Sequence, residues 1–265
     1  MCELFGLSGS LAMTTTLSLE RLARHGGPEG HLADGWGIGF YDGPGVRLFR
    51  EPASAAESVW VAFIAKQKIR SPLVMSHLRH ATQGEVCLRN TQPFAREVGG
   101  RMHLFTHNGR LPGIERHLAG QWSRFRPLGT TDSEIAFCVL LERLAPCWSE
   151  AKPGMPERLA AVVRFARDLR QLGPANFLYA DGEFLFAHGD RRVQRDGRTA
   201  APGLHLLLRE CAQDVDAPPD AAVAVGGLEA AALVASVPLT DESWRPLAEG
   251  EIVALQHGAL AARAT

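Results

Sequence analysis

Short β-type runs follow one another along this chain with only a turn between many of them. Asp42-Gly43 and Asp181-Gly182 have the composition of hairpin turns, because glycine reaches the positive φ angles that tight turns need. Strands joined by such turns pair antiparallel, whereas parallel strands need a long crossover between them. The pattern therefore predicts antiparallel sheets. The expected strands are Glu3–Ser8, Trp36–Tyr41, Val46–Arg50, Leu73–Arg79, His103–His107, Asn176–Ala180, Glu183–His188, Leu204–Arg209, Leu233–Val237 and Ile252–Gln256.

Apolar residues at helical spacing mark a smaller number of segments, which are grouped rather than placed between strands. Thr131 and Glu134 have the spacing of a capping box. Grouped strands and grouped helices predict an α+β class and disfavour a dinucleotide-binding fold. The expected helices are Leu17–Ala23, Ala55–Ile69, Ser133–Leu144 and Glu157–Leu172.

The composition excludes several classes of partner. Lys and Arg number 28 against 29 Asp and Glu, so no electrostatic footprint for nucleic acid or an anionic membrane is present. No apolar run reaches the roughly 18 residues of a spanning helix, and we expect a cytoplasmic protein. The five cysteines form no CxxC pair, which predicts neither a zinc site nor a disulfide framework. Evenly spread turn signals favour a single domain over residues 2–265.

Cys2 becomes the N-terminal residue when the initiator methionine is removed, and a side chain this small permits that removal. One residue then carries both a thiol and a free α-amine. A thiol titrates near about 8.5 and an α-amine near about 7.7–8.0, so the amine can act as the base that activates the thiol. The ordinary alternative is a small buried hydrophobe at the start of the first strand.

Three further segments supply the groups that an amide-cleaving site needs. Arg79 follows a strand, and a guanidinium binds a carboxylate by two parallel hydrogen bonds. Asn108-Gly109 can aim a side-chain amide and a backbone N–H at one point, as an oxyanion hole requires. Asp132 begins a helix, where its carboxylate can hold a substrate ammonium. Each also has an ordinary reading: a surface charge, a turn and a helix cap.

The sequence resembles the class II glutamine amidotransferases, which are N-terminal-nucleophile hydrolases, and within them the YafJ-type branch. The resemblance covers nearly the whole chain and is specific as a set of motifs. These are Met1-Cys2-Glu3-Leu4, Asp34-Gly35-Trp36-Gly37-Ile38-Gly39, Arg79, Thr82, Gly84, Asn90-Thr91-Gln92-Pro93-Phe94, His107-Asn108-Gly109, Thr131-Asp132-Ser133-Glu134 and Pro238-Leu239-Thr240.

The resemblance implies a four-layer αββα sandwich with two stacked antiparallel sheets and no cofactor. Cys2 is then the nucleophile, and Asn108 with the Gly109 N–H forms the oxyanion hole. Arg79 and Thr82 bind the glutamine carboxylate, and Asp132 its ammonium. The chain departs from the wider family at three places, which are His80, Gln83 and His25-Gly26-Gly27. The last stands where an Arg-Gly pair commonly supports the nucleophile.

Three functions are compatible with these residues. The first is an amidotransferase subunit that passes ammonia to an unidentified protein partner, since 265 residues leave no room for an acceptor domain. The second is a stand-alone hydrolase of a γ-glutamyl amide or peptide. The third is a catalytically silent glutamine-binding module, against which the intact Cys2, Asn108 and Asp132 argue. We expect no metal site, and interpret His77, His103 and His107 as structural hydrogen-bonding histidines.

Overall fold

The structure is a computed structural model that describes residues 2–14, 34–81, 84–121, 123–149, 151–194, 196–209 and 230–265. The helix expected at Leu17–Ala23 and the segment His25-Gly26-Gly27 lie outside the described residues. So do Thr82 and Gln83.

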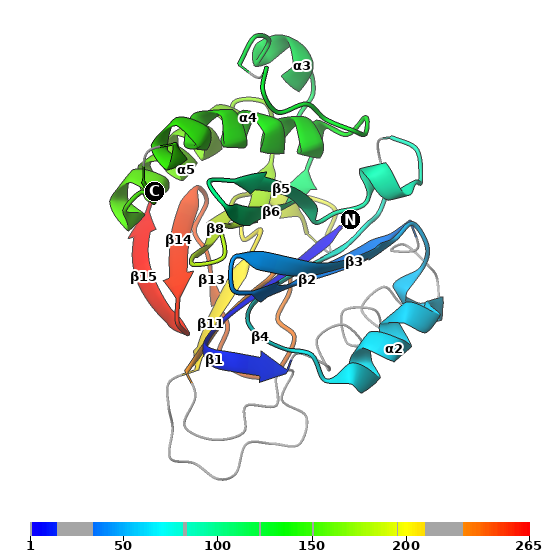
Figure 1. The fold of residues 1–265 in the computed structure, drawn as a ribbon. Coiled ribbons are helices and arrows are strands. Elements are labelled where there is room, and N and C mark those ends of the chain that lie inside the picture. Colours follow the sequence, from blue (N-terminus) through cyan, green and yellow to red (C-terminus); the bar gives the residue numbers. More distant parts are fainter. Residues whose placement is uncertain are drawn as a thin grey trace.

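Two antiparallel sheets form the centre of the protein (Figure 1). The seven-stranded sheet runs in the order β13, β11, β12, β1, β4, β2, β3, and the six-stranded sheet in the order β15, β14, β8, β7, β6, β5. The first sheet consists of β1 (Glu3–Thr14), β2 (Trp36–Asp42), β3 (Gly45–Glu51), β4 (Arg70–Leu78), β11 (His205–Arg209), β12 (Ala231–Ala235) and β13 (Arg245–Pro246). The second consists of β5 (Phe94–Val98), β6 (Arg101–Gly109), β7 (Ala175–Ala180), β8 (Leu185–Gly189), β14 (Glu251–Gln256) and β15 (Ala259–Ala264).

Helices cover the outer faces of the two sheets. Helices α4 (Asp132–Trp148) and α5 (Met155–Arg170) lie over the six-stranded sheet, and α2 (Val59–Gln67) lies beside the seven-stranded one (Figure 1). The smaller elements are η1 (Ala55–Glu57), η2 (Leu88–Asn90), α3 (Ile114–His117) and the ribbon of β9 (Arg192–Val193) and β10 (Thr199–Ala200). The predicted αββα sandwich is confirmed.

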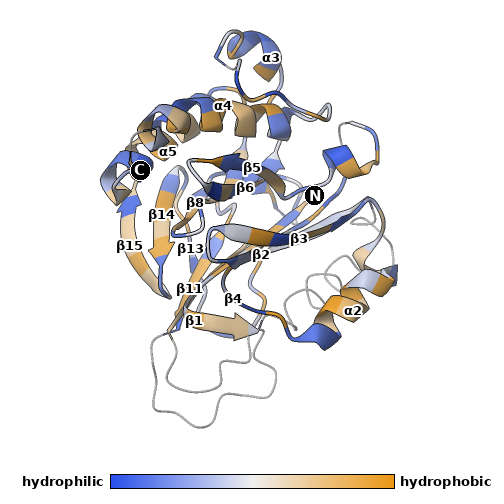
Figure 2. Ribbon diagram, in the orientation of Figure 1, coloured by the Kyte–Doolittle hydropathy of each residue, from blue (hydrophilic) through white to orange (hydrophobic). Residues whose placement is uncertain are grey.

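Three separate apolar clusters fill the spaces between the four layers. Strand β1 contributes side chains to two of these clusters, because its successive side chains point to opposite faces of the sheet. Phe5 and Leu7 pack in the outer cluster with Val61 and Ile64 of α2, while Leu4 packs between the sheets. In Figure 2 the hydrophobic colour marks many residues of the strands and of α2. Burial on both faces explains why β1 reads as an almost unbroken apolar run.

The sheets approach closely where β1 crosses the second sheet. A side chain in place of the hydrogen of Gly6 would begin 2.8 Å from Leu185 Cδ2 and 3.1 Å from Leu178 Cδ1. Both leucines belong to the inter-sheet cluster. The absence of a side chain at this position therefore lets the two layers pack at their observed separation.

The ten predicted strands and both predicted hairpins are confirmed, with shifted ends. Asp42 pairs with Gly45 around the first turn, and Ala180 with Leu185 around the second. Strands β5 and β15 were not predicted, because β5 carries Arg96 and Glu97 and β15 is a mostly exposed edge strand. Both therefore lack a clear apolar pattern.

The prediction of one helix over Ala55–Ile69 is wrong in its extent. Ser58 has extended dihedral angles, and its Oγ accepts a hydrogen bond from the Val61 N–H, so it caps α2 and separates it from η1. The predicted Thr131–Glu134 capping box is half formed. Thr131 Oγ1 accepts from the Glu134 N–H, but the Glu134 carboxylate accepts from Gly129 N–H instead of reaching back to Thr131.

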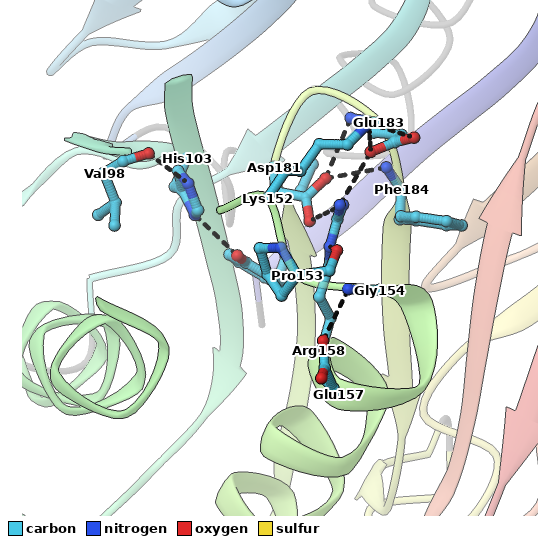
Figure 3. A network of polar contacts seen from close by, with 12 residues as sticks. Val98, His103, Lys152, Pro153, Gly154, Glu157, Arg158, Asp181, Glu183 and Phe184 are labelled. Atoms are coloured by element: carbon cyan, nitrogen blue, oxygen red, sulfur yellow. Dashed lines mark hydrogen bonds and ion pairs between the residues drawn. The ribbon is translucent and has the colours of Figure 1, made fainter. Parts of the chain in front are cut away.

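A buried arginine ties helix α5 to the turn between β7 and β8 (Figure 3). Arg158 Nη1 lies 2.9 Å from Asp181 Oδ2, and Nη2 lies 2.9 Å from Glu183 Oε2. Its guanidinium also lies 4.8 Å from the ring centroid of Trp148. Because Asp181 is fully buried, removal of its cationic partner leaves a charge without compensation.

We expect Arg158→Ala to lower the free energy of unfolding by about 3–5 kcal/mol, the usual cost of removing one partner of a buried pair. Lys152→Ala is the matched control, because Lys152 also pairs with Glu183 but is half exposed, and it should cost less than about 1 kcal/mol. Denaturant unfolding of both variants measures the difference. Equal losses would contradict the proposed role of the buried pair.

Candidate active site

The Cys2 thiol is held at the end of strand β4. Glu3 pairs with Leu78 across the β1–β4 ladder, so the chain on either side of this pair comes together. Cys2 Sγ accepts a hydrogen bond from the His80 N–H at 3.2 Å and donates one to the His80 carbonyl at 3.4 Å. The backbone after β4 thus forms a cradle for the thiol.

A second chain segment fixes that cradle. The Arg79 N–H donates to the Gly35 carbonyl at 2.7 Å, and the Ala81 N–H donates to Asp34 Oδ2 at 2.8 Å. Gly35 has a φ of +147°, which favours glycine. The Asp34-Gly35 start of the glycine-rich motif therefore orients the residue that binds the thiol.

Burial and nearby charges act in opposite directions on the thiol. Burial raises the pKa of Cys2, and the His80 hydrogen bond and the positive charge of Arg79 lower it. The negative charge of Asp132 raises the same pKa. Both proposed substrate-binding charges are therefore close enough to the nucleophile to influence its protonation.

Asn108 reaches the nucleophile from the other sheet, at the end of β6. Its Nδ2 donates to the Cys2 carbonyl oxygen at 2.6 Å. The backbone carbonyl of Asn108 accepts a hydrogen bond from Asn176 Nδ2 at 3.2 Å. Next to it, the side-chain amide of Gln92 binds both backbone groups of His107, accepting from its N–H at 2.6 Å and donating to its carbonyl at 3.3 Å. These side-chain amides hold the strand end in place.

Gly109 has no room for a side chain. A Cβ at this position would lie 1.9 Å from the Pro174 carbonyl oxygen and 2.8 Å from His107 Nε2. The residue itself is exposed, although Asn108 beside it is buried. The close passage of Pro174 therefore explains why glycine stands at the end of β6.

The proposed nucleophile and oxyanion hole share one cavity of about 330 Å³. Arginines dominate its charged lining. The lining residues are Cys2, His80, Asn108, Gly109, Arg110, Pro174, Asn176, Arg191, Arg192, Val193 and Thr199. The structure thus brings together three of the six predicted site residues in this cavity.

Arg79 and Asp132 are buried and do not line the cavity. The Arg79 guanidinium donates to the carbonyls of Gly84 and Glu85, at 3.3 and 3.1 Å. Asp132 Oδ2 accepts from the Leu111 N–H at 2.9 Å, and Oδ1 from the Ser133 N–H at 2.8 Å. Substrate binding by either group therefore adds to, or replaces, these protein contacts. The third predicted ligand, Thr82, lies outside the described residues.

Asn90 joins the loops that carry these two charged groups. Its Nδ2 donates to the Glu85 carbonyl at 3.0 Å, and its Oδ1 accepts from the Thr130 N–H at 2.8 Å. Asn90 is fully buried. The side-chain amides of Asn90, Gln92 and Asn176 support the site, and none of the three was predicted to do so. Asn90 and Gln92 belong to the Asn90–Phe94 motif, and amide side chains between two predicted strands were the signal that could have identified them.

The buried histidines are structural groups with different surroundings. His103 bonds Tyr179, and His107 Nδ1 lies 2.9 Å from Ser133 Oγ. Among the residues that the structure describes, neither ring nitrogen of His77 has a hydrogen-bond partner, so its interpretation as a hydrogen-bonding histidine is wrong. It instead packs as a neutral ring. Among the described residues, no group of three or more His, Cys, Asp or Glu side chains converges to hold a metal.

Comparison with known proteins shows the family to which the chain belongs. The profile of the family "Glutamine amidotransferases class-II" matches residues 1–265. YafJ of Escherichia coli (strain K12) is 36% identical over 256 residues, which are 95% of this chain and 96% of YafJ. A solved structure of a predicted glutamine amidotransferase from Pseudomonas aeruginosa PA01 is 29% identical, with a TM-score of 0.69 over 98% of this chain and 100% of that one.

A more distant structure has the same fold. Glutamine phosphoribosylpyrophosphate amidotransferase from B. subtilis is 18% identical, with a TM-score of 0.62 over 98% of this chain and 48% of its own. The chain belongs to the class II glutamine amidotransferases, enzymes with an N-terminal cysteine nucleophile and an Ntn-hydrolase fold. Glutamine is the substrate of this family. Among the described residues, no helix is both long and apolar enough to cross a bilayer.

The buried histidines make stability depend on pH. Burial lowers the pKa of His77 to about 3, from an ordinary 6.5. Above pH 6.5 the ring is neutral in both states, and the full stability is present. As the pH falls from 6.5 toward 3, His77 binds a proton in the unfolded chain but stays neutral in the folded protein, so the free energy of unfolding decreases.

We expect His77→Leu to make the loss of stability on acidification shallower, by up to about 1.4 kcal/mol per pH unit between pH 6 and 4. The same change at the exposed His117 is the control and should leave the slope unchanged. Urea unfolding at a series of pH values measures both slopes. Parallel profiles for the His77 variant and the wild type would contradict the assignment.

Proposed function

We propose that this protein hydrolyses the side-chain amide of glutamine through a thioester on Cys2 and releases ammonia to a partner protein. The observation that carries the proposal is the meeting of the Cys2 thiol with Asn108 and Gly109 in one cavity. A nucleophile and two potential hydrogen-bond donors in one cavity are the minimum that acyl transfer requires.

The first step forms the thioester. The free α-amine of mature Cys2 accepts the thiol proton, and the sulfur attacks the amide carbon of glutamine. The carbonyl oxygen becomes an oxyanion, which Asn108 and the Gly109 N–H stabilise. An amide nitrogen has two hydrogens, so Asn108 can donate one to the Cys2 carbonyl and the other to the oxyanion.

The second half of the reaction releases ammonia and glutamate and regenerates the free enzyme. The ammonium form of the Cys2 amine gives its proton to the departing nitrogen, and ammonia leaves. Water then attacks the thioester carbon with the amine as base, which yields glutamate and the free thiol. Every proton is accounted for by one amine, so no histidine base is required.

Two charged groups would hold the rest of glutamine. Arg79 and Thr82 bind its α-carboxylate, and Asp132 binds its α-ammonium. Both charges already influence the Cys2 thiol, which supports their placement around one substrate. Asn90 connects the two loops by hydrogen bonds and would keep the Arg79 guanidinium and the Asp132 carboxylate at a constant separation.

A γ-glutamyl peptide is the second candidate substrate. Three arginines, Arg110, Arg191 and Arg192, line the cavity beside Cys2, and a departing ammonia molecule needs no cation. A peptide leaving group carries its own carboxylate, which an arginine would bind. Steady-state rates with glutamine and with γ-glutamyl dipeptides distinguish the two, since a true peptidase prefers the dipeptide.

We expect Asn108→Ala to lower kcat for glutamine by about 10²–10³, with a smaller change in KM, because the oxyanion exists only during reaction. Asp132→Asn should raise KM more than it lowers kcat. Cys2→Ala should abolish ammonia release and defines the background of the assay. An Asn108→Ala effect confined to KM would show that Asn108 binds substrate and does not stabilise the oxyanion.

A further inference from the structure

A second cavity, of about 940 Å³, adjoins the one at the nucleophile and shares Arg192 and Val193 with it. Glu3, directly after the nucleophile in sequence, contributes its side chain to this second cavity. Much of the remaining wall is apolar. Its lining includes Pro202, His205, Ser236, Val237 and Pro238.

The second cavity lies on the outer face of the seven-stranded sheet. Leu4 packs between the sheets and Phe5 in the outer cluster, so Glu3 follows Phe5 to the outer face. On β11, His205 shares its face with Leu207, which also belongs to the outer cluster. Cys2 directly precedes the first residue of β1 and lines the other cavity, so the two cavities meet at the start of this strand.

Glu3 is the unusual member of this wall. Its side chain is only 8% exposed, and its Oε2 is buried with no hydrogen-bond partner in the described part of the chain. The neighbouring Arg192 donates Nη1 to the Ser236 carbonyl at 2.6 Å instead. Burial raises the pKa of Glu3, and the charge of Arg192 acts against this. A buried carboxylate without a donor is costly, and a donor entering the cavity would offset the cost.

His205 also lines this cavity, and its Nδ1 is buried. Hydrogen bonds to the backbone of Ser236 and Ala235 raise the pKa of its ring, against the larger effect of burial. Burial lowers the pKa of His205, which keeps the ring neutral at physiological pH and able to accept a hydrogen bond without repelling a cation. A buried carboxylate oxygen and a neutral imidazole thus share a cavity that combines apolar surface with the polar side chains of Arg192, Gln194, Asp196 and Ser236.

We propose that this cavity binds a small organic amine, whose ammonium group donates to Glu3 and whose apolar body lies against Val193, Val237 and Pro238. An ammonium supplies the donors and the positive charge that a buried carboxylate lacks. Asp196, Gln194 and Ser236 also line the cavity and offer oxygen atoms, but an inorganic cation bound by them would leave the apolar surface of Val193, Val237 and Pro238 uncovered. The site goes beyond the proposed amide hydrolysis and does not depend on it.

The test is calorimetric titration of n-pentylamine into the Cys2→Ala protein, which removes any reaction at the nucleophile. We expect saturable binding at one site, weakened at least tenfold by Glu3→Gln. Glu115→Gln, at an exposed carboxylate, should leave the affinity unchanged. Asp132→Asn should also leave it unchanged, which separates this site from the proposed glutamine grip. 1-Pentanol, which lacks the charge, should bind at least tenfold more weakly than the amine.

Val237→Trp is a second variant that fills the cavity without altering a charge, and it should abolish amine binding while the thermal midpoint stays near that of the parent. This keeps the test decisive if Glu3→Gln folds poorly. Absence of saturable binding overturns the proposal, as does an affinity that falls only with Asp132→Asn. If Glu3→Gln leaves amine binding intact, the carboxylate is not the ligand and the proposal is wrong.

Discussion

The hydrogen bond from the His80 N–H to the Cys2 sulfur is the contact around which the site is organised. It forms because β1 lies in the interior of its sheet, between β4 and β12, and brings the N-terminus to the place where β4 ends. Ladder pairing of Glu3 with Leu78 fixes this register. A one-residue slip would turn every side chain of β1 to the opposite face, which would place Phe5 and Leu7 between the sheets and remove them from the outer cluster.

The proposed oxyanion hole depends on the stacking of the two sheets. Cys2 leads into the seven-stranded sheet and Asn108 ends a strand of the six-stranded one, so their hydrogen bond crosses from one sheet to the other. The small volume of Gly6 sets how closely the sheets approach at β1. The amides of Gln92 and Asn176 then fix the end of β6. Packing far from the thiol therefore controls the geometry around it.

The antiparallel sheets were predictable from the hairpin turns and the grouped helices, whereas the stacking of two sheets in four layers was implied by the resemblance to the class II glutamine amidotransferases. Strands with mixed or exposed side chains, such as β5 and β15, were missed, since pairing rather than apolar pattern defines them. The meeting of Cys2, Asn108 and Gly109 followed from motifs. The support by Asn90 and Asn176 did not, because an amide's partner can lie anywhere in the chain. Packing likewise decides that, within the part of the chain that the structure describes, the ring nitrogens of His77 and the Oε2 atom of Glu3 have no hydrogen-bond partner.

The central claim is that the α-amine of Cys2 activates its own thiol. The most direct measurement blocks methionine removal, confirms the intact N-terminus by mass spectrometry, and follows ammonia release from glutamine during trimming by a purified aminopeptidase. A retained peptide bond turns a base with a pKa near about 8 into a non-basic amide. The account predicts activity that rises in step with the loss of Met1. Equal activity before and after trimming would contradict it.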